Sequence, residues 1–482
     1  MDFKTRIYFH ILIIIVLLNL SFCAKRSKEE WKSRSIYQVL TDRFAKAGND
    51  VSADCANIAT GYCGGTFKGI QEKLDYIKGM GFDAIWISPP LKNKEGSYHG
   101  YHNIDIYNIN EHFGTSEELK ELIKECHKKD IWVILDAVPN HMSGDLPIET
   151  FIPFNKSEYY HEDCQTYNET SQTDIENCRI WGMPDLAQEN EFVKETLLNW
   201  IKDIIKDYGF DGVRYADVQN VPKRFWKEFT KAADTYTLGI ISGNNAAYIA
   251  DYQRYMDGVG DYPLFYAIRE SFCGSMKKLE EYHLNTHKLY INPSYNGIWL
   301  GNHDKPRFLS ECNNKQLLRN AIIFILFYEG IPIFYYGDEQ YFSGGGNDQN
   351  REVMFSNHDT SSDAYKMIKT ANKVRKSQKI FEQSYIEVFV DDYLYAFRRG
   401  NVLVIVSNVE AIERTLTEHR FKEGDYLCDT LDKEDCIRVT NGELKIKLEG
   451  EPKLYVLFDD SKYFNKSNFM TLFLFLILIL SF

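Results

Sequence analysis

The sequence predicts an α/β protein built on a (β/α)8 TIM barrel, with a small inserted domain after the third strand and a C-terminal antiparallel β domain. Three observations support this fold. Apolar strand-like runs alternate with amphipathic helical runs up to about residue 380, a polar segment interrupts them at 141–185, and short alternating strands follow after 381. A chain of 482 residues accommodates one barrel of about 250 residues with smaller appendages.

The predicted barrel strands are short apolar runs, at 36–40, 84–88, 132–136, 212–215, 238–241, 299–301 and 332–336. Helical patterns such as 117–129 and 192–208 lie between them. This order favours parallel strands joined by right-handed crossovers. The alternation alone fits an open doubly wound sheet equally well, and it is the sequence motifs below that favour the closed barrel.

The N-terminal end has the layout of a secretion signal. Lys4 and Arg6 precede an apolar run at 11–20, and small residues follow near Cys23. We therefore expect a signal peptide over residues 1–23. An N-terminal membrane anchor is the alternative, although the run is shorter than the roughly 20 residues that a membrane span needs.

The C-terminal end has the layout of a glycosylphosphatidylinositol (GPI) attachment signal. Residues 469–482 are apolar to the last position, and a polar spacer at 462–468 precedes them. We expect this signal to cover 459–482, with Ser461 or Asp460 as the attachment residue. A membrane-spanning tail is the alternative, but the stretch is short and lacks basic residues on a cytoplasmic side. The expected location is the cell surface or the cell wall.

Charge and glycosylation motifs agree with a secreted protein. The net charge of -13 disfavours a nucleic-acid partner, and we expect a monomer. The sequons that begin at Asn155 and Asn168 would accept glycans.

Ten cysteines in a secreted chain indicate disulfides. Cys428 and Cys436 are close together in a β-rich segment, and Cys273 and Cys312 are a further candidate pair. Cys126 lies on a predicted helix, where we expect a buried free thiol.

A series of motifs, in a fixed order along the chain, carries a family resemblance. The motifs lie at 35–37, 40–44, 73–82, 98–101, 136–141, 211–217 and 302–304. Through them, residues 31 to about 458 resemble the calcium-dependent α-amylases of glycoside hydrolase family 13, most closely the secreted fungal type. Any one motif could arise by chance, but the ordered series could hardly do so.

The resemblance also implies a division into domains and two disulfides. The barrel is expected at 24–140 and 186–380, the inserted domain B at 141–185 and the C-terminal β domain at 381–458. The implied disulfides join Cys55 to Cys63 and Cys164 to Cys178.

Two catalytic positions of the family are substituted in this chain. Retaining glycosidases need two carboxyl groups about 5 Å apart, one as nucleophile and one as acid. The motif match places Ala216 at the nucleophile position and Ile240 at the acid position. Asp304 matches the third carboxylate, which stabilises the transition state. Because catalytic groups act as a unit, hydrolysis by the family mechanism is not expected.

Asp217 is an alternative nucleophile, directly after the substituted position. Side chains alternate along a strand, so Asp217, three residues after Arg214, should point away from the face of Arg214 unless a bulge shifts it. The acid has no comparable substitute, because 242–245 contain no carboxyl group.

The positions that contact sugar in the family are largely retained. The resemblance assigns substrate binding to His99, Tyr101, His141, Arg214, His303, Asp348 and Arg351. Gln219 and Asn220 replace two residues that normally touch sugar on the leaving side. A structural role for the histidines is the alternative, but both His141 and His303 lie at predicted strand ends, where barrel sites form.

The resemblance further implies one calcium ion between the inserted domain and the barrel. Its ligands would be the side chains of Asn140 and Asp185 and the main-chain oxygens of Glu176 and Asn220. Hard oxygen ligands of this kind suit calcium. The alternative is a set of hydrogen-bonded polar residues without a metal.

Three functions remain open from the sequence. The first is a GPI-anchored α-amylase homologue that has lost hydrolysis and binds or organises α-1,4-glucan. The second is an active α-amylase or transglycosylase that uses Asp217. The third is a protein-interaction ectodomain on an amylase scaffold.

Overall fold

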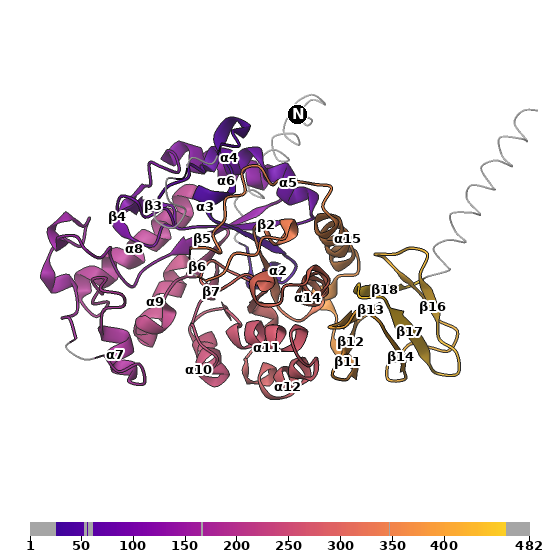
Figure 1. The fold of residues 1–482 in the computed structure, drawn as a ribbon. Coiled ribbons are helices and arrows are strands. Elements are labelled where there is room, and N and C mark those ends of the chain that lie inside the picture. Colours follow the sequence, from indigo (N-terminus) through magenta and orange to yellow (C-terminus); the bar gives the residue numbers. More distant parts are fainter. Residues whose placement is uncertain (1–25, 53–54, 56–60, 165–166, 347, 459–482) are drawn as a thin grey trace, which may run out of the picture.

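The computed structural model describes residues 26–52, 55, 61–164, 167–346 and 348–458 (Figure 1). The expected signal peptide, 1–23, and the expected GPI signal, 459–482, lie outside these residues. Among the helices of the described ranges, none has the length and hydropathy needed to cross a membrane.

Eight parallel strands form the barrel, in the order β8-β7-β6-β5-β2-β1-β10-β9. A parallel bridge between Gly260 and Gly297 links the two outer strands and closes the ring. This confirms the closed barrel over the open sheet. The strands are β1 (Ile36–Val39), β2 (Ala84–Ile87), β5 (Trp132–Ala137), β6 (Gly212–Tyr215), β7 (Tyr236–Gly239), β8 (Gly258–Val259), β9 (Gly297–Trp299) and β10 (Ile331–Tyr335).

Helices surround the barrel in Figure 1 and bury its strands. The principal ones are α4 (Phe67–Glu72), α5 (Leu74–Gly79), α6 (Ser116–Lys128), α8 (Glu191–Tyr208), α9 (Lys223–Ala233), α10 (Ala246–Asp251), α11 (Tyr262–Phe272), α12 (Lys277–Asn285), α14 (Lys315–Phe327) and α15 (Asp363–Ser377). Short helices α2 (Lys28–Trp31), α3 (Thr41–Phe44) and α13 (Phe308–Glu311) complete the barrel.

Local sequence explains where the long helices begin and end. Thr115 and Glu118 form a capping box at the start of α6, and the Asn190 side chain accepts hydrogen bonds from the first turn of α8. Gly209 ends α8 in a left-handed conformation with φ 82°. Both helices lie within one residue of their predicted bounds.

The seventh strand differs from its prediction. It occupies Gly297–Trp299 rather than 299–301, because Leu300 and Gly301 already belong to the loop that carries His303. The sixth strand, Gly258–Val259, has only two residues and no predicted counterpart.

The segment between β5 and α8 contains α7 (Gln172–Asn177) and a disulfide between Cys164 and Cys178, as expected. It packs beside the hairpin of β3 (Leu91–Asn93) and β4 (Asn103–Ile109), and Ser143 N donates to the Asn103 oxygen at 2.9 Å. Asn155 and Asn168 are both exposed, as glycan acceptors must be.

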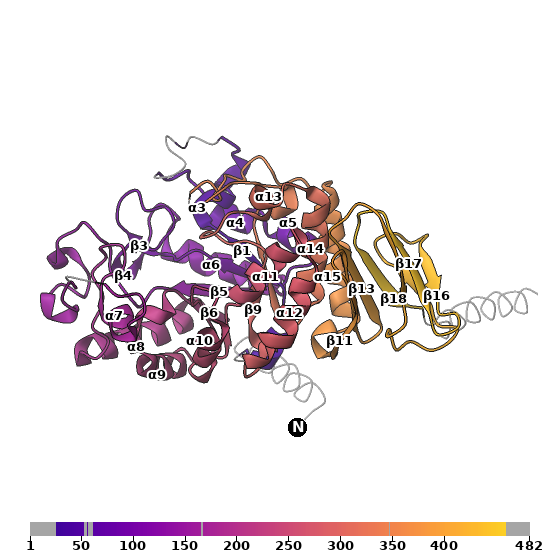
Figure 2. The same cartoon turned by 60° about the horizontal axis from the view of Figure 1, so that its bottom comes forward.

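The C-terminal part is an antiparallel β domain, which lies to one side of the barrel in Figures 1 and 2. Its larger sheet has the order β11-β12-β13-β18-β15-β16, and β14 pairs with β17. The strands are β11 (Tyr385–Val390), β12 (Leu394–Arg399), β13 (Val402–Ser407), β14 (Ile412–Leu416), β15 (Tyr426–Asp429), β16 (Cys436–Arg438), β17 (Leu444–Leu448) and β18 (Lys453–Leu457).

The remaining cysteine predictions are also confirmed. Disulfides join Cys55 to Cys63, Cys273 to Cys312 and Cys428 to Cys436. Cys126 is a buried free thiol.

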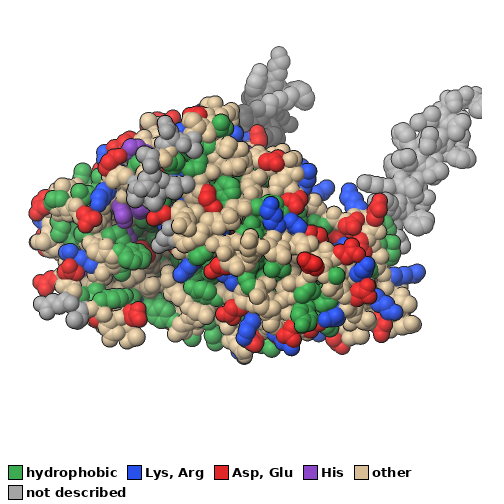
Figure 3. Space-filling view, in the orientation of Figure 1, with side chains coloured by type: hydrophobic (Ala, Val, Ile, Leu, Met, Phe, Trp, Pro, Cys, Tyr) green, Lys and Arg blue, Asp and Glu red, His purple; other side chains and the backbone are tan. Residues whose placement is uncertain are grey.

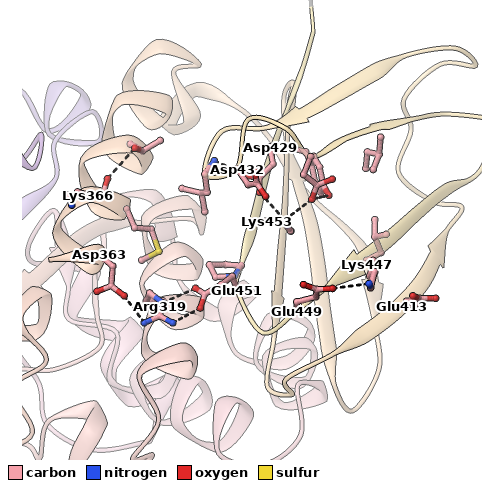
Figure 4. A pocket seen from close by; sticks show the side chains of 18 of the residues that line it. Arg319, Asp363, Lys366, Glu413, Asp429, Asp432, Lys447, Glu449, Glu451 and Lys453 are labelled. Atoms are coloured by element: carbon pink, nitrogen blue, oxygen red, sulfur yellow. Dashed lines mark hydrogen bonds and ion pairs between the residues drawn. The ribbon is translucent and has the colours of Figure 1, made fainter. Parts of the chain in front are cut away.

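A hollow of about 960 Å³ lies between the C-terminal domain and helices α14 and α15 (Figure 4). Its charged side chains largely pair with one another. Lys453 lies 2.6 Å from Asp435 and 3.4 Å from Asp429, while Arg319 binds Glu451 and Asp363. Arg319 comes from α14 and Glu451 from the β domain, so this pair ties the two parts together.

Candidate active site at the barrel mouth

The predicted site residues meet at the carboxyl ends of the barrel strands. Arg214 lies in β6, Ala216 and Asp217 follow that strand, Ile240 follows β7, and His303 and Asp304 follow β9. Barrel enzymes form their sites at this end. Figure 3 shows histidine side chains reaching the surface on the half of the molecule away from the C-terminal domain.

A buried carboxylate, Asp136 at the end of β5, organises the floor of the site. Arg214 Nη1 donates to Asp136 Oδ1 at 2.8 Å, and Tyr101 Oη donates to Oδ2 at 2.6 Å. Trp86 Nε1 also donates to Oδ2, at 3.0 Å. Burial raises the pKa of Asp136, and the Arg214 charge opposes that rise. The charge of Arg214 is therefore balanced inside the barrel.

Three aromatic rings form a wall beside this floor. The centroid of the Tyr101 ring lies 5.1 Å from that of His303 and 5.8 Å from that of His99. Gln38 Nε2 donates to His303 Nδ1 at 3.0 Å. Since Nδ1 accepts this bond, the proton of the neutral imidazole is on Nε2, which lies 3.3 Å from Asp304 Oδ1. Burial lowers the pKa of His303 to about 4, so the imidazole is neutral and can donate to a hydroxyl group.

Asp304 stays ionised in this environment. Burial alone would raise its pKa, but the neighbouring His303, followed by Arg214 and Arg351, holds the pKa below its ordinary value. Its side chain is 42% exposed, so the carboxylate is accessible from the mouth.

Asp348 and Arg351 form an ion pair on the rim. Arg351 Nη1 donates to Asp348 Oδ1 at 3.0 Å, and Arg351 Nε donates to the main-chain oxygen of His303 at 3.0 Å. Tyr98 Oη donates to the same Asp348 oxygen at 3.1 Å. The pair is therefore attached to the loop that carries His303 and Asp304.

The two positions that the resemblance assigns to the nucleophile and the acid are apolar and buried. Ala216 is 2% exposed and Ile240 is 6% exposed. Ile240 and Trp299 both lie against Gly260, where a β-carbon would clash with each of them. Nε of Arg214 is buried without a hydrogen-bond partner in the described part of the chain. The barrel therefore places an aliphatic surface where the family resemblance puts the acid.

Asp217 lies at the mouth, contrary to the expectation that it points away. The strand ends at Tyr215, so strand alternation no longer governs Asp217, which has a left-handed backbone with φ 49°. Its Oδ2 lies 3.8 Å from His141 Nδ1. Burial and the charge of Asp304 raise the pKa of Asp217 to about 6, while Arg214 opposes the rise.

Two other predicted residues connect Asp217 to its surroundings. His141 Nε2 donates to the main-chain oxygen of Tyr101 at 3.1 Å, and burial lowers the pKa of His141 to about 4. Gln219 Oε1 accepts from Ser242 N at 2.8 Å, which joins the loop after β6 to the loop after β7.

The predicted calcium ligands also converge. One terminal atom of the Asn140 amide lies 2.8 Å from the main-chain oxygen of Asn220 and 3.0 Å from Asp185 Oδ1. The other terminal atom lies 3.3 Å from His141 Nδ1. If the first atom is nitrogen, it donates to both oxygens. If it is oxygen, three oxygens face one another, which requires a shared cation.

The donor set fits a hard cation. Asn220 Nδ2 donates to the Ile175 oxygen at 3.0 Å, so α7, which contains Glu176, reaches the same cluster. His161 Nδ1 donates to Asp185 Oδ2 at 2.6 Å and leaves Oδ1 toward Asn140. Among the described residues, no group of three or more His, Cys, Asp or Glu side chains is arranged for a metal, so a cation here depends on amide and carbonyl oxygens.

The sequence analysis did not assign roles to four residues that hold the site together. Asp136 accepts from Arg214 and from Trp86, Gln38 donates to His303, and Tyr98 binds the rim pair. Asp136 and Tyr98 stand inside the quoted motifs, so the motifs were the available signal for them.

Comparisons with known proteins identify relatives of this chain. The family described as "Alpha amylase, catalytic domain" matches residues 38–379. An α-amylase of Saccharomycopsis fibuligera is 34% identical over 466 residues, which cover 90% of this chain and 93% of that protein.

Solved structures share the fold. An α-amylase from Malbranchea cinnamomea superposes with a TM-score of 0.86 at 33% identity, covering 90% of this chain and 98% of that one. An α-amylase from Geobacillus thermoleovorans, solved in complex with acarbose, gives a TM-score of 0.82 at 33% identity, covering 90% and 100% of the two chains. The chain described here belongs to the α-amylase family of glycoside hydrolases.

Proposed function

We propose that this protein binds α-1,4-glucan at the barrel mouth and does not hydrolyse it by the two-carboxylate mechanism of its family. The observation that carries the proposal is that both substituted positions, Ala216 and Ile240, are apolar and buried while the surrounding polar groups remain. Neither side chain can attack an anomeric carbon or transfer a proton.

The polar groups that remain suit the hydroxyl groups of a glucose unit. Neutral His303 can donate a hydrogen bond, ionised Asp304 can accept two, and the Tyr101 ring provides a flat face. Arg351 and Asp348 supply further donors and acceptors on the rim. These groups bind and orient a sugar without breaking a bond.

The location and the cation are parts of the same proposal. The terminal segments support secretion and attachment by a GPI lipid, which would place the glucan site at the cell surface or in the cell wall. The oxygen cluster of Asn140, Asp185 and Asn220 supports one calcium ion, which would fix the segment that follows His141 to the barrel.

A second candidate function is catalysis through Asp217, favoured by its position 3.8 Å from His141 and near the charge of Arg214. Without an acid, only a good leaving group could depart. With α-glucosyl fluoride, an Asp217 oxygen would bond to the anomeric carbon as the carbon–fluorine bond breaks and fluoride takes the electron pair. Water would then cleave the glycosyl ester, releasing glucose and a proton.

The decisive experiment measures binding and cleavage on the same preparation. We expect the purified protein to bind maltoheptaose by calorimetry and to release no product above a buffer blank. Release of fluoride from α-glucosyl fluoride, lost in Asp217→Asn but kept in the matched exposed-site control Asp234→Asn, would establish the second function. Absence of maltoheptaose binding would remove the first.

A further inference from the structure

Trp181 is the most exposed large apolar side chain in the described part of the chain. It is 83% exposed, and the next, Ile291, is 62% exposed. Its indole makes no hydrogen bond, ring contact or cation contact within the described residues. An isolated exposed tryptophan contributes little to folding, because its burial supplies no hydrophobic stabilisation.

The backbone at Trp181 is also unfavourable for this residue type. Met183 N donates to the Ile180 oxygen at 3.0 Å, and both central residues of this turn have positive φ, 51° at Trp181 and 74° at Gly182. This is the pattern of a type I′ turn, which prefers Asn, Asp or Gly at its first central position. A bulky side chain there is strained, and such strain concentrates at ligand sites.

The turn is held firmly beside the barrel mouth. Cys178, on one side of it, is bound by a disulfide to Cys164. On the other side, Pro184 accepts a hydrogen bond from Met142 N at 3.1 Å, and Asp185 pairs with His141 in a β-bridge. The turn therefore lies just before Asp185, which pairs with His141, the histidine 3.8 Å from Asp217.

We propose that Trp181 is a stacking platform for a glucose unit of the bound glucan, outside the unit held at His141 and His303. The inference rests on the proposed function. The C–H face of a pyranose ring packs on an aromatic face, and the free indole N–H can donate to a hydroxyl group. Because the ring lies outside the central site, it contacts long glucans and not short ones.

The surroundings of Trp181 favour a sugar over a protein partner. Energetically important residues of protein interfaces lie within a larger desolvated patch. Trp181 instead stands between Gly182 and the segment that carries Arg179, which pairs with the exposed Asp163 at 3.7 Å. A single ring in a polar setting suits the alternating apolar and hydroxyl faces of a glucan.

The test compares Trp181→Asn with the wild type for maltoheptaose and maltotriose binding. Asn suits the left-handed backbone, so we expect the melting temperature to stay equal or rise. Loss of one stacked ring should weaken maltoheptaose binding about three- to tenfold and leave maltotriose binding unchanged. Trp181→Phe should keep most of the affinity. If the wild type cleaves these sugars, the series is run in the Asp217→Asn background.

Controls separate this inference from the proposed function. Tyr393 is 50% exposed on the C-terminal domain, and Tyr393→Ala should leave both affinities unchanged. A wild type that binds neither sugar contradicts the proposed function itself. A wild type that binds maltoheptaose with the same affinity as Trp181→Asn contradicts only the role of Trp181. In a second measurement, maltoheptaose should protect the wild-type emission from acrylamide quenching more than that of Trp181→Asn, and equal protection would also contradict it.

Discussion

Arg214 retains its charge partner and lacks the acceptor that the family motif would provide. Its Nη1 binds Asp136, while its Nε is buried without a hydrogen-bond partner in the described residues. A buried donor without an acceptor costs about 1–3 kcal/mol. An aspartate in place of the neighbouring Ala216 is the change that could supply the missing acceptor.

Introducing both carboxyl groups that the resemblance predicts to be missing is therefore an informative change. We expect Ala216→Asp/Ile240→Glu to recover weak cleavage of maltoheptaose, and each single substitution to recover almost none, because nucleophile and acid act as a unit. Product formation by chromatography checks this. The matched control is Ala216→Asn/Ile240→Gln, which has similar size and no carboxylate. A single substitution as active as the double one would contradict the shared role.

Glu339 is a second residue whose environment determines its chemistry. It is fully buried, and its Oε1 accepts from Tyr37 Oη at 2.5 Å and from Tyr76 Oη at 2.9 Å. Burial raises its pKa to about 7. The folded protein therefore holds a proton that the unfolded chain loses near pH 4.5.

This shift predicts a pH dependence of stability. The stabilisation is fully present below pH 4.5 and is lost as the pH rises through 7, because the unfolded state binds fewer protons over that range. The change is on the order of 3 kcal/mol. In Glu339→Gln the side chain stays neutral, so its free energy of unfolding relative to wild type should rise between pH 5 and pH 8. The exposed-site variant Glu382→Gln should follow the wild type, and parallel curves for Glu339→Gln and wild type would contradict the prediction.

Single residues also mark the limit of the sequence analysis. The position of Asp217 depends on where β6 ends and on a left-handed backbone, neither of which a strand pattern contains. Asp136 is a central group because three elements bring Arg214, Tyr101 and Trp86 to it. By contrast, the assignment of Ala216 and Ile240 to the nucleophile and acid positions comes from the motif resemblance alone and stays a prediction.

At the scale of elements, long periodic segments were predictable and short ones were not. Helices α6 and α8 carry strong caps and periodic apolar faces, so local sequence determines their bounds. The strand β8 has two residues, held by neighbours on both sides of the closing ring. Tertiary pairing fixes such a strand, and the local sequence contains too few residues to show it.

The short helix α2 closes the end of the barrel opposite to the site. Trp31 is fully buried, its Nε1 donates to the Asp211 oxygen at 3.1 Å, and its ring lies 5.0 Å from Trp132 and 5.1 Å from Tyr236. All three neighbours lie at or just before the first residues of β5, β6 and β7. The helix therefore packs on the strand starts and away from the mouth.

We expect Trp31→Ala to destabilise the protein by about 3–5 kcal/mol, because it leaves a large cavity under the barrel. Maltoheptaose affinity of the folded fraction should stay within about twofold, since the change lies at the far end of the strands. Denaturant unfolding and calorimetry measure the two effects. Trp181→Asn is the converse control, because we expect it to weaken maltoheptaose binding without destabilising the protein. A large affinity loss in Trp31→Ala would contradict this separation of ends.

For the whole molecule, the proposed GPI signal predicts attachment to the membrane through a lipid. We expect phosphatidylinositol-specific phospholipase to release the protein from cells, because the apolar segment at 469–482 would be removed when the lipid is attached. If the lipid resists the phospholipase, mass spectrometry of the C-terminal peptide shows whether a lipid is attached. Recovery of a mature peptide that contains 473–480 would contradict the prediction.

The proposed calcium site joins three parts of the molecule. Asn140 follows β5, Asp185 ends the segment that carries Trp181, and Asn220 belongs to the turn directly after Asp217. A cation shared by their oxygens would lower the free energy of the folded state only, since the unfolded chain does not assemble the three groups.

Removal of calcium should therefore lower the melting temperature and weaken glucan binding together. At a free ion concentration 100 times the Kd, the stabilisation is about 2.7 kcal/mol. A chelator should abolish it, and added calcium should restore it better than magnesium, because carbonyl and amide oxygens form a site without the strict octahedral geometry that magnesium requires.

In Asp185→Asn the chelator should have little further effect, whereas the exposed-site control Asp145→Asn should respond as the wild type does. If melting is unchanged by the chelator and elemental analysis finds no calcium, the Asn140 amide nitrogen holds the cluster by hydrogen bonds instead.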